Sequence, residues 1–162
     1  MIQLKFTVTE KSLEFNSPPE RQDAAVVLET IFEMPVIMNV NGRNLLGPTP
    51  ETPTVMSVLG FAVEAVDAIR RLHPGGTVHV SIASSGTLHL KEEDGIIRLW
   101  TNSAPWHAEA PLDEVVSAFQ QFHRDVQRVI ETRVPSMRTH PYWDRWFPRT
   151  ERSGGAPPAR HV

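Results

Sequence analysis

The sequence predicts an α+β fold in which an antiparallel β-sheet of about six or seven strands carries two main helices on one face. Three observations indicate this fold. Short segments alternate polar and apolar residues, and tight-turn pairs join them into hairpins, which make antiparallel strands. Two longer segments, at 53–72 and 111–134, carry apolar residues at helical spacing on one side only. Helices with one apolar stripe bury it most economically against one side of such a sheet.

The N-terminal part of the chain predicts three strands. Residues 2–8 alternate apolar and polar side chains, which is typical of a half-buried strand. After a proline-rich loop at 17–20, a stretch rich in β-branched residues predicts strands at about 24–33 and 35–40. Asn41-Gly42 then predicts a tight hairpin turn, because both residues tolerate positive φ.

The two helices have recognisable ends. Thr52 is suited to cap the first helix, and Pro53 suits its first position because no hydrogen bond is lost there. The His-Pro-Gly-Gly stretch at 73–76 ends that helix. The second helix is expected to open at Pro111 and to stop before Pro135.

The middle of the chain gives the clearest strand pattern. Residues 78–82, 88–91 and 97–100 alternate apolar and polar side chains, and a fourth short strand is expected around 104–109. Asp94-Gly95 is the second strong hairpin signal. A two-residue turn there fixes the pairing of the strands on either side, counted outward from the turn.

This register predicts a candidate binding surface. Leu90 then faces Leu99 on the core side, while Lys91 faces Arg98 and His89 faces Trp100 on the other side. A like-charge pair directly across a sheet costs stability, and proteins keep such pairs on a solvated face or for an acidic partner. Trp and Arg are also enriched at interface hot spots. We therefore predict a basic, partly aromatic partner-binding face made of His79, His89, Lys91, Arg98 and Trp100.

Two alternatives to this face stay open at the level of sequence. A register shifted by one residue would turn these side chains toward the core. The C-terminal segment at 139–147, which is dense in aromatic residues, would also hide them if it covered the same face. Helical spacing of those aromatic residues favours a different role, in which a short helix is clamped onto the core.

The domain organisation is simple. Residues 1–148 read as a single globular domain, and residues 149–162 have the composition of a flexible tail that cannot build a core. No internal repeat and no second domain are visible.

Composition excludes several classes of function. The net charge is −3 and the pI is near 6.2, so we expect no nucleic-acid partner. The absence of cysteine excludes disulfides, thiolate metal sites and a cysteine nucleophile. The sequence has no apolar run typical of a signal peptide or of a membrane span, so we expect a cytoplasmic protein without membrane contact.

No motif specifies a reaction, so we predict no catalytic residues, no metal and no cofactor. The Ser-Ser-Gly turn at 84–86 lacks the frame of a nucleophile elbow, and Gly75-Gly76 follows a helix instead of preceding one. The acidic triplet at 92–94 is better explained as a solubilising hairpin turn than as a cation site. Three imidazoles on one sheet face would suit zinc, but no supporting ligand spacing accompanies His79, His89 and His107.

The layout resembles that of small bacterial immunity proteins, which are encoded beside polymorphic or contact-delivered toxins. The resemblance spans roughly residues 2–147. It lies in a Gly-Thr-Leu-His-Leu and Asp-Gly-Ile-Ile-Arg-Leu hairpin at 86–99, a Pro-Leu-Asp-Glu-Val helix start at 111–115 and a closing Pro-Tyr-Trp at 141–143. It implies that the chain binds and neutralises one toxin. Such families have no fixed functional residues to transfer.

Taken together, these features favour a non-enzymatic protein-binding module, and specifically an immunity-type protein that neutralises a cognate toxin by direct binding. The alternative is a small ligand-binding domain or enzyme that uses a pocket between the helices and the sheet, lined by His123 and Ser117. A third possibility is a subunit of a larger assembly, which a large apolar surface patch would indicate. The sequence leaves the oligomeric state open.

Overall fold

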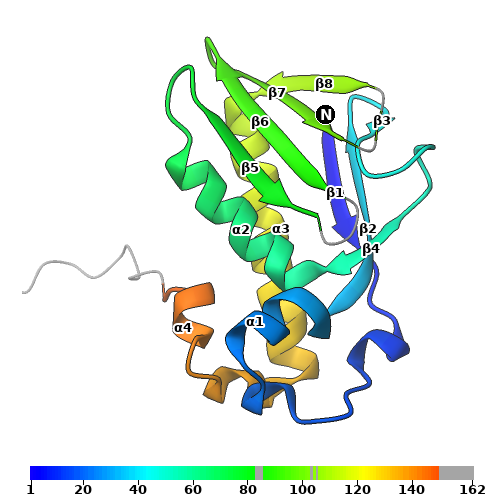
Figure 1. The fold of residues 1–162 in the computed structure, drawn as a ribbon, viewed down its shortest axis with the longest axis vertical. Helices are drawn as coiled ribbons and strands as arrows, with labels where there is room; N and C mark the ends of the chain where they lie inside the picture. The colour runs from blue at the N-terminus through cyan, green and yellow to red at the C-terminus, as the bar shows by residue number, and fades with distance from the viewer. Residues whose placement is uncertain (83–85, 103, 105, 150–162) are drawn as a thin grey trace, which may run out of the picture.

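The computed structural model describes residues 1–82, 86–102, 104 and 106–149 and confirms the α+β class (Figure 1). The strands of the described residues form two four-stranded antiparallel sheets instead of one larger sheet. Both sheets pack against the same two helices, α2 and α3, so the expectation of two main helices on the inner side of the strands holds for each sheet. Nearly all of the predicted tail, residues 150–162, lies outside the described residues.

The first sheet is built around one long strand. β2 pairs antiparallel with β1, and also with β3 and β4, so it lies at the centre of the sheet. Asn41 and Gly42 have φ values of 52° and 82°, which confirms the predicted turn between β2 and β3. The strands are β1 (Ile2–Phe6), β2 (Glu33–Val40), β3 (Arg43–Asn44) and β4 (Thr54–Ser57).

The second sheet follows the chain, in the order β5-β6-β7-β8, with every neighbouring pair antiparallel. Asp94 and Gly95 have φ values of 54° and 82°, and the register counted from this turn is confirmed. The expected fourth strand is also present, although it starts later than predicted. The strands are β5 (Thr77–Ser81), β6 (Thr87–Glu93), β7 (Ile96–Thr101) and β8 (His107–Pro111).

The first main helix, α2 (Val58–Arg71), ends where it was predicted but begins later. Residues 54–57 do not start the helix, because they pair with β2 as the strand β4. Ser57 is the N-cap in place of Thr52, and its hydroxyl accepts a hydrogen bond from the amide of Gly60 at 3.3 Å. Tertiary pairing with β2 therefore overrides the local helix-start signal of Thr52-Pro53.

The second main helix, α3 (Leu112–Arg133), confirms both predicted ends. Pro111 precedes it, and Pro135 opens the short 3₁₀ helix η5 (Pro135–Thr139) after it. The C-terminal helix α4 (Trp143–Trp146) is clamped as predicted, since Trp143 and Trp146 are buried in the core. No helix within the described ranges is long and apolar enough to cross a bilayer.

The predicted strand at 24–33 is wrong. Residues 24–31 form the short helix α1 (Ala24–Val26), which continues into the π-helical segment η3 (Val27–Ile31), and β2 starts only at Glu33. Ala24, Val27, Leu28 and Ile31 all pack on the core, and their spacing is helical. Two further short 3₁₀ helices are η1 (Glu10–Leu13) and η2 (Pro19–Arg21).

A cluster of phenylalanine rings holds the layers together. Phe122 of α3 lies edge-on against Phe6 of β1 at 5.3 Å and against Phe61 of α2 at 5.5 Å between ring centroids. The inner face of the second sheet is also buried against the helices, through its apolar residues Val78, Val80, Leu88, Leu90, Ile97 and Leu99. The opposite face of β5–β8, here called the outer face, carries the alternate residues of these strands.

Candidate functional site

The outer face brings together all five residues predicted to bind a partner. His79 of β5, His89 of β6 and Trp100 of β7 lie directly across from one another, which places them in one row across the sheet. Lys91 lies across from Arg98 in the neighbouring row. The register therefore places these side chains side by side, as the hairpin turn predicted.

The aromatic row is a connected network. His89 stacks on Trp100, with ring centroids 5.0 Å apart and planes at 11°. His89 Nε2 lies 3.1 Å from Asn102 Oδ1, and its Nδ1 lies 2.8 Å from Nδ1 of His79. An amide oxygen only accepts, so His89 donates from Nε2 to Asn102 and accepts at Nδ1 from His79. The two imidazoles therefore hold each other and the Trp100 ring in fixed orientations.

The row continues beyond the five predicted binding residues to His107 of β8, which was expected on the same face and lies directly across from Trp100. Because the Trp100 ring separates His107 from the other two imidazoles, the three histidines do not converge as a zinc site requires. Among the residues that the structure describes, no group of three or more His, Cys, Asp or Glu side chains is placed to hold a metal ion.

The prediction of a basic face is wrong in one respect. Lys91 Nζ lies 2.6 Å from a carboxylate oxygen of Glu93, and Arg98 Nη2 lies 3.3 Å from one of Glu109. Each cation therefore has a carboxylate neighbour, which offsets its charge and weakens the repulsion between Lys91 and Arg98. Sequence reasoning missed Glu109, because the register of β8 against β7 was not predicted. These ion pairs are exposed to solvent, so they contribute little to the stability of the fold.

A hollow of about 330 Å³ opens on the outer face beside Trp100. Trp106, which follows β7 in the chain, forms part of its wall, and its indole N–H donates to the carbonyl of Asn44 at 3.0 Å. That bond fixes Trp106 against the first sheet. Sequence reasoning missed Trp106, although its place at the start of the predicted strand 104–109 was a usable signal. The hollow is lined by Lys91, Arg98, Trp100, Thr101, Ala104, Trp106 and His107.

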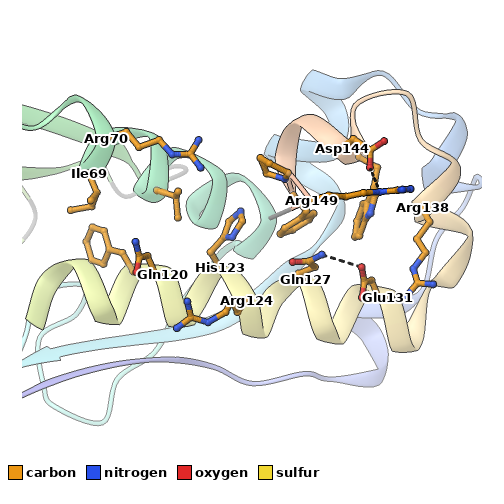
Figure 2. Close-up of a pocket in the computed structure, with 15 residues that line it drawn as sticks. Ile69, Arg70, Gln120, His123, Arg124, Gln127, Glu131, Arg138, Asp144 and Arg149 are labelled. Carbon is orange, nitrogen blue, oxygen red and sulfur yellow. Dashed lines mark hydrogen bonds and ion pairs between the residues drawn. The ribbon is translucent and has the colours of Figure 1, made fainter. Parts of the chain in front are cut away.

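A second candidate site is a cavity of about 1100 Å³, called here the helix cavity, between α2, α3 and the C-terminal segment (Figure 2). It differs from the predicted pocket, because it lies against the C-terminal segment and not between helices and sheet. His123 lines it as predicted, but Ser117 lines a separate surface hollow near Met1. Six positions along a helix rotate a side chain by about 240°, so these two residues point in different directions.

The surroundings of His123 in the helix cavity lower its pKa below the ordinary value of a histidine. Burial lowers the pKa of His123, although a hydrogen bond of 2.8 Å to the carbonyl of Trp146 raises it. The positive charges of Arg70 and Arg124 lower the pKa further. A carbonyl only accepts, so the Nε2 of His123 carries the proton and its Nδ1 is left as an acceptor.

The acidic triplet at 92–94 has a structural role that the sequence did not indicate. The carboxylate of Glu92 is buried and accepts hydrogen bonds from the amide of Gly95 at 2.6 Å and from that of Gly75 at 2.7 Å. It therefore ties the β6–β7 turn to the turn that follows α2. These bonds lower the pKa of Glu92, with the Gly95 bond as the largest cause.

We expect Glu92→Gln to destabilise the protein near neutral pH. A group whose folded pKa lies below its unfolded value of 4.5 contributes stability above pH 4.5 and loses it as the pH falls through the folded pKa. The unfolding curves of the variant and the wild type should therefore converge below pH 4.5. Urea unfolding from pH 3 to pH 7 measures this. The control is Glu93→Gln, whose exposed ion pair with Lys91 should matter less; equal effects of the two variants would contradict the role of Glu92.

Comparison with known proteins gives no relative from which to transfer a function. No protein-family model, no curated protein and no solved structure matches the chain.

Proposed function

We propose that the chain is a non-enzymatic protein-binding module that uses the outer face of β5–β8, and that it is an immunity-type protein that neutralises a cognate toxin by binding it. The observation that supports this most strongly is the place of Trp100. Its ring is half-buried, held by His89 on one side and open to the hollow on the other. A preorganised indole beside a hollow is the arrangement found at interface hot spots.

The surroundings of the hollow suit a protein partner. Two indole rings, Trp100 and Trp106, form its walls, so one apolar side chain of the partner would be buried between large aromatic surfaces. The rim is polar and carries both signs of charge, because Lys91 and Arg98 stand beside carboxylates. An apolar centre within a polar rim is the usual anatomy of a protein interface.

The immunity-type part of the proposal is supported by the layout of the chain. The residue patterns that resemble immunity proteins include the β6–β7 hairpin, which carries four of the five predicted binding residues. The partner would then be a toxin protein. Neutralisation requires only that the complex covers the part of the toxin that acts on its target.

We expect Trp100→Ala to weaken the complex with the cognate toxin by about 2 kcal/mol, or roughly thirtyfold in Kd. Arg98→Glu should weaken it by about tenfold, because it replaces a cation with an anion beside Glu109. The proposal predicts that a toxin is encoded beside this gene, and that protein is the partner to test, with calorimetry for affinity and growth rescue for neutralisation.

The matched control is Lys5→Glu, an equal change of charge at an exposed position in β1 of the first sheet. It should leave the affinity unchanged, and circular dichroism should show that all three variants fold. Unchanged affinity in both Trp100→Ala and Arg98→Glu would rule out the outer face as the binding surface.

A further inference from the structure

We infer that the helix cavity binds a small organic anion, with its carboxylate or phosphate group held between Arg70 and His123 and its apolar part against the aromatic wall. This site is separate from the outer face and does not depend on the proposed function. Among the described residues, it combines a cavity, a cation (Arg70) without a carboxylate partner and an imidazole (His123) whose Nδ1 has no hydrogen-bond partner.

The size and lining of the cavity suit a small molecule. Its volume of about 1100 Å³ is slightly above the usual range for ligand pockets, which combine apolar walls with a few polar groups. A second, narrower cavity of about 500 Å³ adjoins it, since Val66, Arg70 and His123 line both. The apolar part of the main wall consists of Val66, Ile69, Phe119, Trp143, Phe147 and Pro148.

Arg70 is the cation best placed to hold the anion. Arg138 and Arg149, which line the other end of the cavity, have carboxylate partners in Glu131 at 3.2 Å and Asp144 at 3.8 Å. Within the described part of the chain, no carboxylate lies within ion-pair distance of Arg70. Figure 2 shows the Arg70 side chain reaching from α2 toward the space above His123. A guanidinium in this position would bind a carboxylate or phosphate through two parallel hydrogen bonds.

His123 would supply the second contact. Its ring is fixed by the bond from Nε2 to Trp146 and by packing on Phe147, with ring centroids 4.7 Å apart. The lone pair on Nδ1 repels an anion when the ring is neutral, whereas a protonated ring donates from Nδ1. Binding of an anion therefore takes up one proton at His123, and its affinity should rise as the pH falls.

Other charged groups around His123 come from every wall of the two cavities and nearly balance one another. All four acids are already engaged, since Glu64 accepts from the amide of Ser81, and Asp67, Glu131 and Asp144 have arginine partners. The charged residues of the lining are Glu64, Asp67, Arg70, Arg124, Glu131, Arg138, Asp144, Arg145 and Arg149.

The test is calorimetric titration of the full chain with phenyl phosphate, benzoate and benzenesulfonate, and with benzyl alcohol as the uncharged analogue. We expect saturable binding of the anions and none of the alcohol. Arg70→Gln should lose about ten- to a hundredfold in affinity, which is what a charge-assisted contact contributes. The ranking of phenyl phosphate against benzoate identifies which anion the site prefers.

The control variant is Arg128→Gln, which removes the same charge from an exposed position on α3 that lines neither cavity. It should bind the anions like the wild type. Benzenesulfonate keeps its charge over the whole range, so its affinity should rise from pH 8 to pH 6 in the wild type and stay level in His123→Gln. No saturable binding of any anion, or Arg70→Gln binding as well as Arg128→Gln, would overturn the inference.

Discussion

Replacing Phe122 with alanine is expected to lower the free energy of unfolding by about 3–5 kcal/mol. Phe122 is buried, and its ring contacts Phe6 of β1 and Phe61 of α2, so its removal opens a cavity where three elements meet. These neighbours are themselves fixed in a sheet and in a helix, and they cannot move far to fill the space. Urea unfolding monitored by circular dichroism measures the loss.

The control for Phe122 is the substitution by leucine, which keeps most of the volume but not the ring contacts. It should cost clearly less than the alanine variant. A loss below about 1 kcal/mol in Phe122→Ala would show that the ring cluster does not join the first sheet to the helices.

Gly60→Ala is expected to lower the free energy of unfolding by about 3 kcal/mol, at the upper end of the range for overpacking. Helix propensity alone predicts the opposite sign, since alanine is favoured over glycine in a helix by about 1 kcal/mol. A Cβ at this position would lie 2.2 Å from the carbonyl oxygen of Leu28 in η3. That oxygen belongs to the backbone, and the neighbouring Phe32 carbonyl accepts from the amide of Val58, so the two segments cannot easily separate.

The control for Gly60 is Ser117→Ala, an exposed position on α3 where alanine should raise stability by a few tenths of a kcal/mol. Thermal unfolding of both variants shows whether Gly60→Ala lowers or raises the stability of the protein. A more stable Gly60→Ala variant would mean that η3 does not press against the start of α2.

The parts of the fold that local chemistry specifies were predictable from the sequence. Asp94 and Gly95 tolerate the positive φ that a two-residue hairpin turn requires. Counting outward from this turn predicted the β6–β7 register, which places His89 beside Trp100. Pro111 and Pro135 likewise mark the ends of α3, because proline fits only outside the hydrogen-bonded body of a helix.

The parts that depend on contacts distant in sequence were not predictable. Residues 54–57 follow the helix-start signal of Thr52-Pro53 but form β4, because β2 provides a pairing edge. Residues 24–31 are helical although they are rich in β-branched residues, which favour strands. The helical spacing of their apolar residues indicated the helix, but the composition was given more weight. The division of the strands into two sheets is likewise a property of the assembled fold.

The candidate sites divide in the same way. The outer face was predictable because a single hairpin contains most of it. The place of Glu109, and the position of His107 opposite Trp100, depend on the pairing of β8 with β7. The helix cavity was only partly foreseen through His123. Arg70, which we propose to bind the same anion as His123, comes from α2, whereas His123 comes from α3. No local sequence pattern links the two residues.

The central claim, that the outer face is the partner-binding surface, is tested most directly by site-specific photo-crosslinking. A benzophenone amino acid placed at His107, which is exposed at the end of the aromatic row, should crosslink to the cognate toxin in the complex. The same group at Lys5, on the other sheet, should give no crosslink. An intact complex that crosslinks from Lys5 and not from His107 would contradict the account.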